Sequence, residues 1–410
     1  MTERLGVDSL LIVQKYGGTS VGTVERIEAV ADRVLRTLEQ GHQAVLVVSA
    51  MGHTTDELVR LAHAIERTPD EREYDALLST GEQVSASLVA MALQKRGIKA
   101  RSFTGWQAGI ETEPVHGAAR MVKIDAQVLR QAIDDGVVPV ITGFQGIAEG
   151  SITTLGRGGS DTTAVAVAAV LEADACEIYT DVTGVFTTDP RVVKSAHKLA
   201  EISYDEMLEL ANLGAQVLHP RAVENAKQYH VRLVVRSSFA EEEGTWVVET
   251  PAGLEQQNVV TGVAFEREVA RIALIGVPIN RHGLAMVFST LATRGINVDV
   301  IVQSVVQTSE VDVSFTVKEE DSDRALSIMR EMKAELEYRD LVCETGLAKV
   351  SIVGAGMISN PGVAAQMFGE LAQADVPVKM VSTSEIKVSC IIPATQIEMA
   401  VQHLHKAFLE

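Results

Sequence analysis

Cysteine is scarce in this sequence, and its few cysteines lie far apart. Cys176, Cys343 and Cys390 are the only three in 410 residues, with no CxxC pair and no CxxC…HxxxH spacing. The sequence therefore gives no basis for a disulfide framework or a structural zinc site. This usage fits a reducing compartment, and we expect a cytoplasmic protein.

Long apolar runs and an excess of positive charge are also missing. The N-terminus lacks a cationic stretch followed by a long apolar core, and the run from Ala164 to Leu171 is too short to span a bilayer, so we expect no export and no membrane insertion. The formal net charge of -19 argues against sequence-independent binding of nucleic acid, which relies on clustered lysine and arginine. A local cationic pocket for a nucleotide is compatible with this charge.

Two common signatures of phosphate chemistry are absent. The chain has no GxxxxGK followed by Ser or Thr, and none of the protein-kinase signatures. If the protein handles phosphate, another arrangement of residues must do so.

The residues that are present predict an α/β domain in the first two-thirds of the chain. A composition of 46% hydrophobic and 22% charged residues over 410 positions suits two or three folded domains. Short Val- and Ile-rich runs, such as 44–50 and 231–238, alternate with helical segments, which predicts a parallel or mixed sheet with helices on both faces. The stretch 239–258 is acidic and turn-rich, and part of it is interpreted as a boundary.

Beyond this boundary the sequence repeats itself. The segment from Ala270 is echoed by the segment from Ala348, and each copy reads strand, Gly-containing loop, helix, two strands and helix. The pattern predicts two βαββαβ units. The repeat can be purely architectural, or a small ligand can bind where the loop meets the helix N-terminus. We predict domains over 1–245, 269–342 and 343–410, with a linker over 246–268.

The first candidate site is a lysine followed by glycines. Leu10 to Val13 predicts a buried strand, Lys15 lies at its end, and Gly17 and Gly18 let backbone approach a ligand. Thr19 and Ser20 can cap the helix that follows, and a helix N-terminus beside a fixed cation favours an anion. A glycine turn with a solvated lysine explains these residues equally well.

Two further segments place polar residues at the ends of predicted elements. The first, 153–173, combines a glycine turn containing Arg157 with Ser160 and Asp161 at the start of a helix, which suits a carboxylate or a phosphate. The second, 178–191, has Asp181 after a strand, where an aspartate is more often a surface residue or a cap than a ligand contact. The five charged candidates at element ends, the usual ligand-facing edge of an open α/β sheet, are Lys15, Arg157, Asp161, Asp181 and Arg191.

Six motifs in order resemble the aspartokinases of the amino-acid-kinase superfamily. They are VQKYGGTSVG, VVSAMGHTTDELV, STGEQVSASL, SFTGWQAGI, ITTLGRGGSDTTAVAVAA and CEIYTDVTGVFTTDPR. The C-terminal repeats resemble the paired ACT regulatory domains of that family, and within it the chain looks closest to the monofunctional, lysine-sensitive enzymes of Gram-positive bacteria. The resemblance implies an open, mostly parallel sheet between helices, followed by two ferredoxin-like ACT domains.

The resemblance also implies a reaction. Aspartokinases transfer the γ-phosphoryl group of MgATP to the β-carboxylate of L-aspartate, giving 4-phospho-L-aspartate, the first step towards lysine, threonine and methionine. ATP is then a co-substrate, Mg²⁺ arrives with it, and no metal site is expected from the protein alone. Because a carboxylate with a reference pKa near 4 is ionised near pH 7, the reaction needs no general base.

Site residues follow from the resemblance position by position. Lys15 would neutralise the transferred phosphoryl group, Asp161 would organise Lys15 or the metal, and Arg157 would act with them. The implied substrate contacts are Thr55, Glu82, Arg157, Gly158, Gly159 and Ser160, with Glu82 on the ammonium group and Arg157 with Ser160 on the α-carboxylate. The implied ATP contacts are Lys15, Tyr16, Gly17, Gly18, Ser49, Thr180, Asp181, Phe186, Thr187, Asp189, Pro190 and Arg191. Without the resemblance, Glu82 would be a capping or solvent-facing helix residue.

The ACT repeats imply an amino-acid effector, L-lysine alone or together with L-threonine, bound between two domains of a homo-oligomer. The implied contacts in the first copy are Asn280, His282, Gly283, Asn297, Val298, Asp299 and Gln303. Those in the second copy are Met357, Asn360, Gly362, Val363, Ser382, Thr383, Ser384 and Glu385. One departure from the family is Gln216, where many relatives carry a lysine that reaches ATP. Some relatives also make a separate regulatory subunit from an internal start, which this sequence leaves open.

Two alternatives remain at this stage. One is a kinase for another acidic metabolite such as glutamate or N-acetylglutamate, although SAMGHTTDEL and the tandem repeats speak against it. The other is an inactive amino-acid-binding regulator, against which the retention of Lys15, Glu82, Arg157 and Asp161 argues. We expect no attached homoserine dehydrogenase domain.

Overall fold

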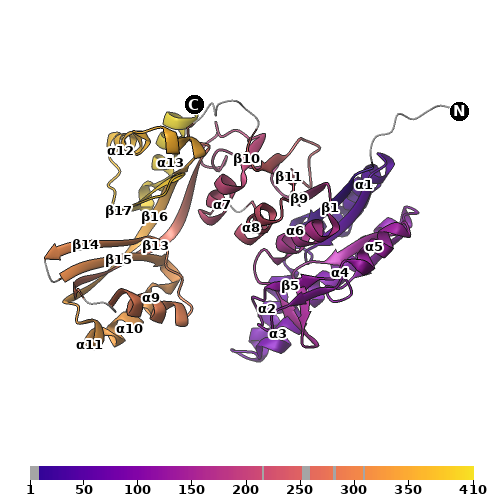
Figure 1. Cartoon of the computed structure of the whole chain (residues 1–410), viewed down its shortest axis with the longest axis horizontal. Helices are drawn as coiled ribbons and strands as arrows, with labels where there is room; N and C mark the ends of the chain where they lie inside the picture. Colours follow the sequence, from indigo (N-terminus) through magenta and orange to yellow (C-terminus); the bar gives the residue numbers. More distant parts are fainter. Residues whose placement is uncertain (1–8, 215–216, 252–258, 280–282, 308–309) are drawn as a thin grey trace. The chain divides into compact units, whose positions relative to one another are not determined.

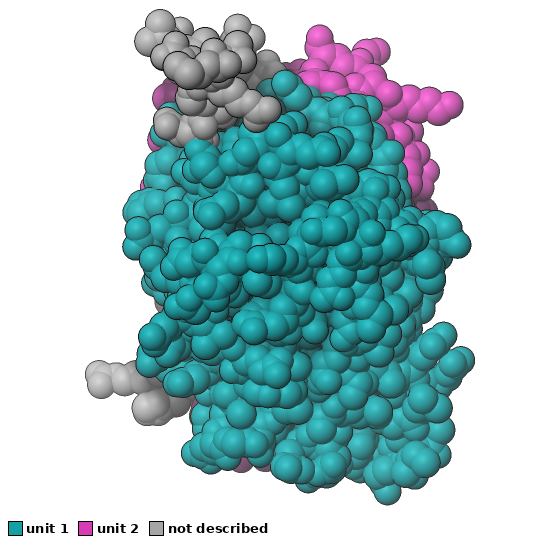
Figure 2. Space-filling model, turned by 90° about the vertical axis from the view of Figure 1, so that its right-hand side faces the viewer, with its two compact units in different colours: residues 1–185, 198–211, 216–252 teal, residues 186–197, 212–215, 253–410 magenta. Residues whose placement is uncertain are grey.

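The computed structural model describes residues 9–214, 217–251, 259–279, 283–307 and 310–410. The described residues form two units, shown in different colours in Figure 2. The first unit comprises 1–185, 198–211 and 216–252, and the second comprises 186–197, 212–215 and 253–410. The short segments 186–197 and 212–215 thus group with the C-terminal unit although they lie within the sequence of the first.

The first unit is built on an eight-stranded sheet with the order β10-β12-β11-β9-β1-β2-β6-β3. Four of these strands, β10, β11, β9 and β1, are labelled in Figure 1. Its strands are β1 Leu11–Tyr16, β2 Gln43–Val48, β3 Ala100–Phe103, β6 Val138–Thr142, β9 Ala175–Thr180, β10 Glu201–Ser203, β11 Leu233–Ser237 and β12 Thr245–Val248. The central strands are parallel and only the pairing of β11 with β12 is antiparallel among the described strand pairs of this sheet. The predicted mostly parallel sheet is therefore confirmed.

Helices cover both faces of this sheet because successive strand residues point to opposite sides. On one face, α1 Val24–Glu39 and α4 Thr80–Lys95 bury Ile27, Val30 and Leu93 against alternate residues of β1 and β2. On the other face, α6 Gly159–Leu171 packs against β1, β2 and β9. The remaining helices of this unit are α2 Thr54–Ile65, α3 Glu71–Leu78, α5 Gln127–Asp134, α7 Tyr204–Asn212 and α8 Pro220–Gln228.

A smaller sheet completes the first unit. It has the order β5-β4-β7-β8, with β4 Ile110–Thr112, β5 Met121–Ile124, β7 Gln145–Ala148 and β8 Ser151–Thr154. Strand β8 ends immediately before the glycine turn that contains Arg157, so this sheet sets where that turn begins.

The second unit has one six-stranded sheet with the order β14-β15-β13-β16-β18-β17 (Figure 1). Its strands are β13 Gly262–Pro278, β14 Ile301–Gln307, β15 Glu310–Lys318, β16 Asp340–Val353, β17 Met380–Thr383 and β18 Lys387–Pro393. Its helices are α9 Gly283–Thr293, α10 Ser322–Glu331, α11 Lys333–Leu336, α12 Val363–Gln373 and α13 Ile397–Leu409. The predicted repeat of strands and helices is present.

The two repeats share their longest strands. The first half of β13, 262–266, pairs with 349–353 of β16, whereas 271–275 pairs with 340–344. The second repeat therefore takes its last strand from 262–266, which precedes the first repeat in the chain and lies within the stretch 246–268 predicted as a linker. The predicted domain boundaries themselves remain predictions.

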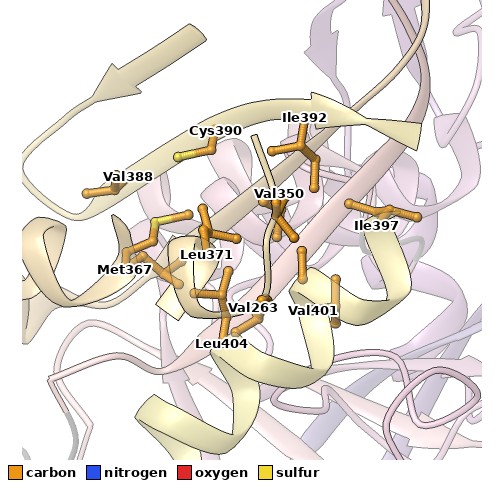
Figure 3. Packing of buried hydrophobic residues seen from close by; sticks show 14 of the residues in the cluster. Val263, Val350, Met367, Leu371, Val388, Cys390, Ile392, Ile397, Val401 and Leu404 are labelled. Atoms are coloured by element: carbon orange, nitrogen blue, oxygen red, sulfur yellow. The ribbon is translucent and has the colours of Figure 1, made fainter. Parts of the chain in front are cut away.

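Each repeat encloses its own apolar core. In the second, side chains from β16, β18, α12 and α13, among them Val350, Met367 and Leu404, point toward one another (Figure 3). Val193 of the segment 186–197 is buried in this cluster, which explains why that segment groups with the C-terminal unit. In the first repeat, Phe315 and Met329 are fully buried.

Among the described residues one helical stretch, 71–95, is long and apolar enough to cross a membrane on those two measures alone. Of its most apolar window, 56% is buried inside the fold, as in a core helix.

Candidate active site

The candidate site lies at one edge of the eight-stranded sheet. Strands β9, β1, β2 and β6 are parallel neighbours, so their carboxyl ends meet at the same edge. Lys15 is the penultimate residue of β1, and Thr180 is the last residue of β9. Ser49 directly follows β2, and Gly143 directly follows β6. Parallel pairing therefore gathers residues that are far apart in the sequence.

Lys15 and Asp161 form an ion pair at this edge. Nζ of Lys15 lies 2.6 Å from Oδ1 of Asp161, and the two side chains are only 11% and 12% exposed. Asp161 occupies the first turn of α6, where a carboxylate is favoured by the helix dipole. A Cβ added at Gly17 would lie 3.4 Å from the Lys15 ammonium, and one at Gly18 would lie 2.9 Å from the Ala50 carbonyl oxygen. The glycines therefore keep the backbone beside the ammonium free of side-chain bulk.

Tyr16 lies on the opposite face from Lys15 because adjacent strand residues alternate. Its ring is fully buried and stacks on Tyr179, with ring centroids 4.8 Å apart. Its hydroxyl donates to Oε1 of Gln14, and burial raises its pKa well above the usual value. Of the predicted ATP contacts, Tyr16 thus offers only its backbone to this edge of the sheet.

Glu82 is a buried carboxyl group with half of its hydrogen-bonding capacity unused. It lies in the first turn of α4, is 3% exposed, and accepts a hydrogen bond of 3.0 Å from the Ala50 N–H through Oε1. Oε2 has no partner within the described chain. Burial raises the pKa of Glu82 to about 7. An unpaired buried carboxylate oxygen is costly, so this group is suited to receive a cationic ligand.

The glycine turn before α6 presents Arg157. Its side chain is exposed and makes no hydrogen bond or ion pair with another residue that the structure describes. Gly158 has φ +68°, and a Cβ there would lie 2.1 Å from Cγ of His219, so only glycine fits this turn. Ser160 follows in the first turn of α6 and is buried beside Gly143.

The other predicted residues of the first unit lie at or next to the ends of strands and helices. Ser49 donates its N–H to Tyr16 O at 3.1 Å, and its own carbonyl oxygen accepts from the Ser85 hydroxyl at 2.7 Å. Thr55 lies half-buried in the first turn of α2. Thr180 donates to the exposed Asp181 at 3.1 Å. The sheet edge thus combines an ammonium group, carboxylates, hydroxyls and a guanidinium, the chemistry needed to hold two anions.

Comparisons with known proteins assign the chain to a family. Residues 11–237 match the model of the amino acid kinase family, and 273–332 and 350–408 match that of the ACT domain. An aspartokinase of Bacillus sp. strain MGA3 is 58% identical over 399 residues, covering 97% of each chain. The chain belongs to the aspartokinase family.

Two crystal structures of an aspartokinase share the fold. Escherichia coli aspartokinase III in complex with aspartate and ADP, in the R-state, is 29% identical with a TM-score of 0.80 over 98% of this chain and 100% of that one. The same enzyme in complex with lysine and aspartate, in the T-state, has a TM-score of 0.76 with the same identity and coverage. The chain is accordingly a phosphotransferase that uses ATP as co-substrate.

The remaining predicted ATP contacts of the aspartokinase family lie in the other unit. Arg191 donates from Nε and Nη2 to the carboxylate of Asp189, at 3.0 and 2.8 Å, and this contact lowers the pKa of Asp189. Thr187 is buried, and its hydroxyl lies 2.9 Å from Nε2 of His405 in α13. Phe186 and Pro190 belong to the same segment. No sequence pattern singles out His405, because α13 reads simply as an amphipathic helix.

The predicted effector contacts are only partly described. Asn280 and His282, like Gln216, lie outside the described residues. Asp299 forms an ion pair with Lys349, which also lies 2.7 Å from Glu266. Gly362, at φ +104°, precedes α12, and Ser382 and Thr383 lie in β17. The further predicted contacts are Gly283 in α9, Gln303 in β14, Met357 in the short 3-10 helix Ala355–Ser359 and Val363 in α12, with Asn297, Val298, Asn360, Ser384 and Glu385 in the adjoining loops.

No group of three or more His, Cys, Asp and Glu residues in the described parts of the chain could enclose a metal ion. Asp161 and Asp181 are acidic side chains at element ends on this edge of the sheet, and Glu82 lies in the first turn of α4. This donor set suits Mg²⁺ only if a ligand's phosphates supply most of the oxygen atoms.

Proposed function

We propose that the chain transfers the γ-phosphoryl group of ATP to the β-carboxylate of L-aspartate. The observation that carries this proposal is the buried Lys15–Asp161 pair at the sheet edge, together with the unused Oε2 of Glu82. The likeness to an aspartokinase bound to aspartate and ADP supports the same pair of ligands. The products would be 4-phospho-L-aspartate and ADP.

Lys15 would act on the transferred group. Two anions must meet in this reaction, so catalysis depends on neutralising charge and aligning the reactants. The pairing with Asp161 holds the ammonium group at the sheet edge in a largely buried position, where electrostatic interactions are strong. In this role Lys15 is the catalytic residue and Asp161 positions it.

The substrate's other charges would be held by separate groups. Glu82 would accept the ammonium group through its unused oxygen, and Arg157 with Ser160 would bind the α-carboxylate. Gly158 and Gly159 would add backbone contacts from this turn, and Thr55 would contact the substrate from α2. The β-carboxylate stays free to attack. Its oxygen forms a bond to the γ-phosphorus as the bond to the ADP oxygen breaks, and no proton transfer is required.

The nucleotide would bind beside Lys15. Backbone N–H groups at Gly17 and Gly18 can approach phosphates, and Ser49, Thr180 and Asp181 end the neighbouring strands. From the family resemblance we extend the nucleotide contacts to Phe186, Thr187, Asp189, Pro190 and Arg191. Mg²⁺ would arrive with the nucleotide phosphates and supply further charge neutralisation, with Asp161 or Asp181 as its protein ligand.

We further propose inhibition by L-lysine, alone or with L-threonine, through the ACT repeats of a homo-oligomer. The lysine-bound T-state structure of E. coli aspartokinase III supports lysine as an effector chemistry for this fold. An effector inhibits only if it binds the less active arrangement more tightly than the active one. The enzyme would then act at the start of lysine, threonine and methionine synthesis.

The decisive assay measures ADP release from MgATP with L-aspartate, L-glutamate, N-acetylglutamate or no acceptor. Each reaction is repeated with lysine, with threonine and with both. We expect turnover that requires aspartate and falls with lysine. Turnover only with another acceptor would contradict the proposed substrate, and heat stabilisation by lysine without any turnover would instead indicate a binding regulator.

A variant pair tests whether Glu82 binds the ammonium group. Glu82→Gln should raise the KM for aspartate by about tenfold or more while kcat changes little. The control is Glu57→Gln, an exposed carboxylate in α2. Equal KM values for the two variants would contradict the assignment of Glu82.

A further inference from the structure

Asp75 is a buried carboxylate that the proposed mechanism does not use. It lies in α3, its side chain is fully buried, and its described partners come from two other segments. Thr154 donates to it twice, from Oγ1 at 2.5 Å and from its N–H at 3.0 Å. The Gly117 N–H lies 3.1 Å from both carboxylate oxygens, and Nδ1 of His116 lies 2.8 Å from Oδ2.

The N–H groups of Thr154 and Gly117 and the Thr154 hydroxyl donate to this carboxyl group, and His116 lies against Oδ2, so both oxygens have partners. A buried charge that loses such donors is left uncompensated, which is costly. Asp75 therefore holds the end of β8 and the 116–117 loop in a fixed relation to α3.

The end of β8 is also the start of the turn that presents Arg157. Thr154 is the last residue of β8, and its carbonyl oxygen accepts from the Ala119 N–H at 2.9 Å. At the next residue, still before the turn, Arg221 donates to Leu155 O at 2.7 Å, and it also donates to Ala119 O at 3.2 Å. Asp75 thus holds the N–H of Thr154, and Arg221 holds the carbonyl oxygen of Leu155. Together they fix the backbone that leads to Arg157.

Arg157 itself has no side-chain partner in the described chain, so its position depends on the backbone from which it projects. We propose that Asp75 is a positioning residue for the phosphoryl-transfer reaction, which sets the affinity for the amino-acid substrate by fixing the strand end that presents Arg157. This inference rests on the proposed function, in which Arg157 binds the α-carboxylate of aspartate. A binding group displaced by a small distance loses affinity even when its chemistry is unchanged.

Asp75→Asn tests the proposal because Asn keeps the shape but turns one acceptor into a donor facing other donors. We expect the KM for aspartate to rise between about tenfold and about a hundredfold, while kcat and the KM for ATP stay within about threefold. The matched control is Asp70→Asn at the N-cap of the same helix, where Asn caps as well as Asp. A folded Asp75→Asn enzyme with the parental aspartate KM, or one that loses only kcat, would overturn the proposal.

Thr154 provides a milder test if Asp75→Asn does not fold. Thr154→Val removes the hydroxyl donor and keeps the N–H, whereas Thr154→Ser keeps both. We expect Thr154→Val to raise the aspartate KM by about threefold to tenfold and Thr154→Ser to stay near the parental value. Equal KM values for the two variants would overturn the proposal.

A double variant separates this proposal from the proposed function. If Asp75 acts through Arg157, Asp75→Asn should change the aspartate KM by less than about twofold in an Arg157→Ala background. If the factors by which the two single variants raise the aspartate KM simply multiply in the double variant, the positioning role is overturned. If Arg157→Ala raises the KM and Asp75→Asn does not, the proposed function stands and only this inference fails. A parental enzyme without aspartate-dependent ADP release would instead refute the proposed function directly.

Discussion

Each of the two units contains a buried lysine in a strand, and the two lysines are neutralised differently. Lys15, 11% exposed, meets the single carboxylate of Asp161 at the end of a strand. Lys349, 5% exposed, lies between the carboxylates of Glu266 and Asp299, in the middle of the six-stranded sheet. Burial alone would lower the pKa of Lys349, but Asp299 and Glu266 together raise it.

The difference shows that burial and pairing do not by themselves mark a catalytic lysine. Lys15 and Asp161 form a neutral pair beside glycines, so an approaching anion meets no excess negative charge and no side-chain bulk. Lys349 with two carboxylates carries a net negative charge, which repels a phosphate. This contrast supports the catalytic role that we propose for Lys15, and we expect a structural role for Lys349.

The largest expected effect comes from removing the ammonium group of Lys15. Lys15→Met should lower kcat by about a thousandfold or more, because the charge that develops on the transferred group loses its fixed counter-ion. The variant should be less stable than the parental enzyme, because the buried Asp161 loses its partner, so its fold must be checked. ADP release under saturating substrates measures the rate, and circular dichroism checks the fold. Turnover within tenfold of the parental enzyme would remove the distinction between the two lysines.

The second-largest expected effect is a change in the KM for aspartate with pH, which Glu82 of the first unit would cause. Because burial raises the pKa of Glu82 to about 7, this group is mostly protonated below pH 7 and ionised above it. Only the ionised form attracts an ammonium group, so we expect the KM for aspartate to fall as the pH rises from 6 to 8. Initial rates at varied aspartate and pH measure this change.

Glu82→Gln serves as the control for that profile. A raised pKa means that the folded state binds this proton more tightly than the unfolded chain, so ionisation of Glu82 lowers the stability of the fold as the pH rises from its usual pKa towards 7. The variant should therefore lose the pH dependence of KM without losing stability at pH 8. A KM profile that persists unchanged in the variant would show that another group titrates.

Sequence patterns could predict the first site because its information is local. Lys15, Gly17 and Gly18 adjoin one strand, and Arg157, Ser160 and Asp161 adjoin one helix start, so strand and helix patterns place them at element ends. The parallel order of the strands then brings these ends together. The alternation that buries Tyr16 follows from the same strand pattern, although the motif match alone assigns that residue to ATP.

The structural lysine could not be predicted in the same way. Glu266 belongs to a charged stretch that reads as a linker, and it becomes a strand only by pairing with the distant β16. Asp75 likewise reads as a surface residue of α3, since nothing local indicates that Thr154 and Gly117 will surround it. Non-local pairing decides both cases, as it decides the grouping of 186–197 with the second unit.

A smaller effect, on stability alone, is expected at the second lysine. Lys349→Met should lower the unfolding free energy of its unit by about 1 to 3 kcal/mol, because two carboxylates lose their cation, while the exposure of Asp299 limits the cost. The uninhibited kcat should stay within about twofold. Thermal unfolding with parallel rate measurements separates the two outcomes, and a large loss of kcat in a folded variant would contradict the structural role.

The smallest effect on the uninhibited rate is expected in β17. Ser382→Ala removes one hydroxyl from a half-buried position while its backbone pairing with Ser389 of β18 remains, so the sheet should keep its geometry. If Ser382 contacts the effector, the lysine concentration for half-inhibition should rise by about threefold to tenfold, the usual range for one hydrogen bond. The control is Ser327→Ala, an exposed serine in α10. If the Ser382 variant loses as much uninhibited rate as lysine sensitivity, Ser382 affects the reaction itself. That result would contradict its role as an effector contact in the ACT repeats.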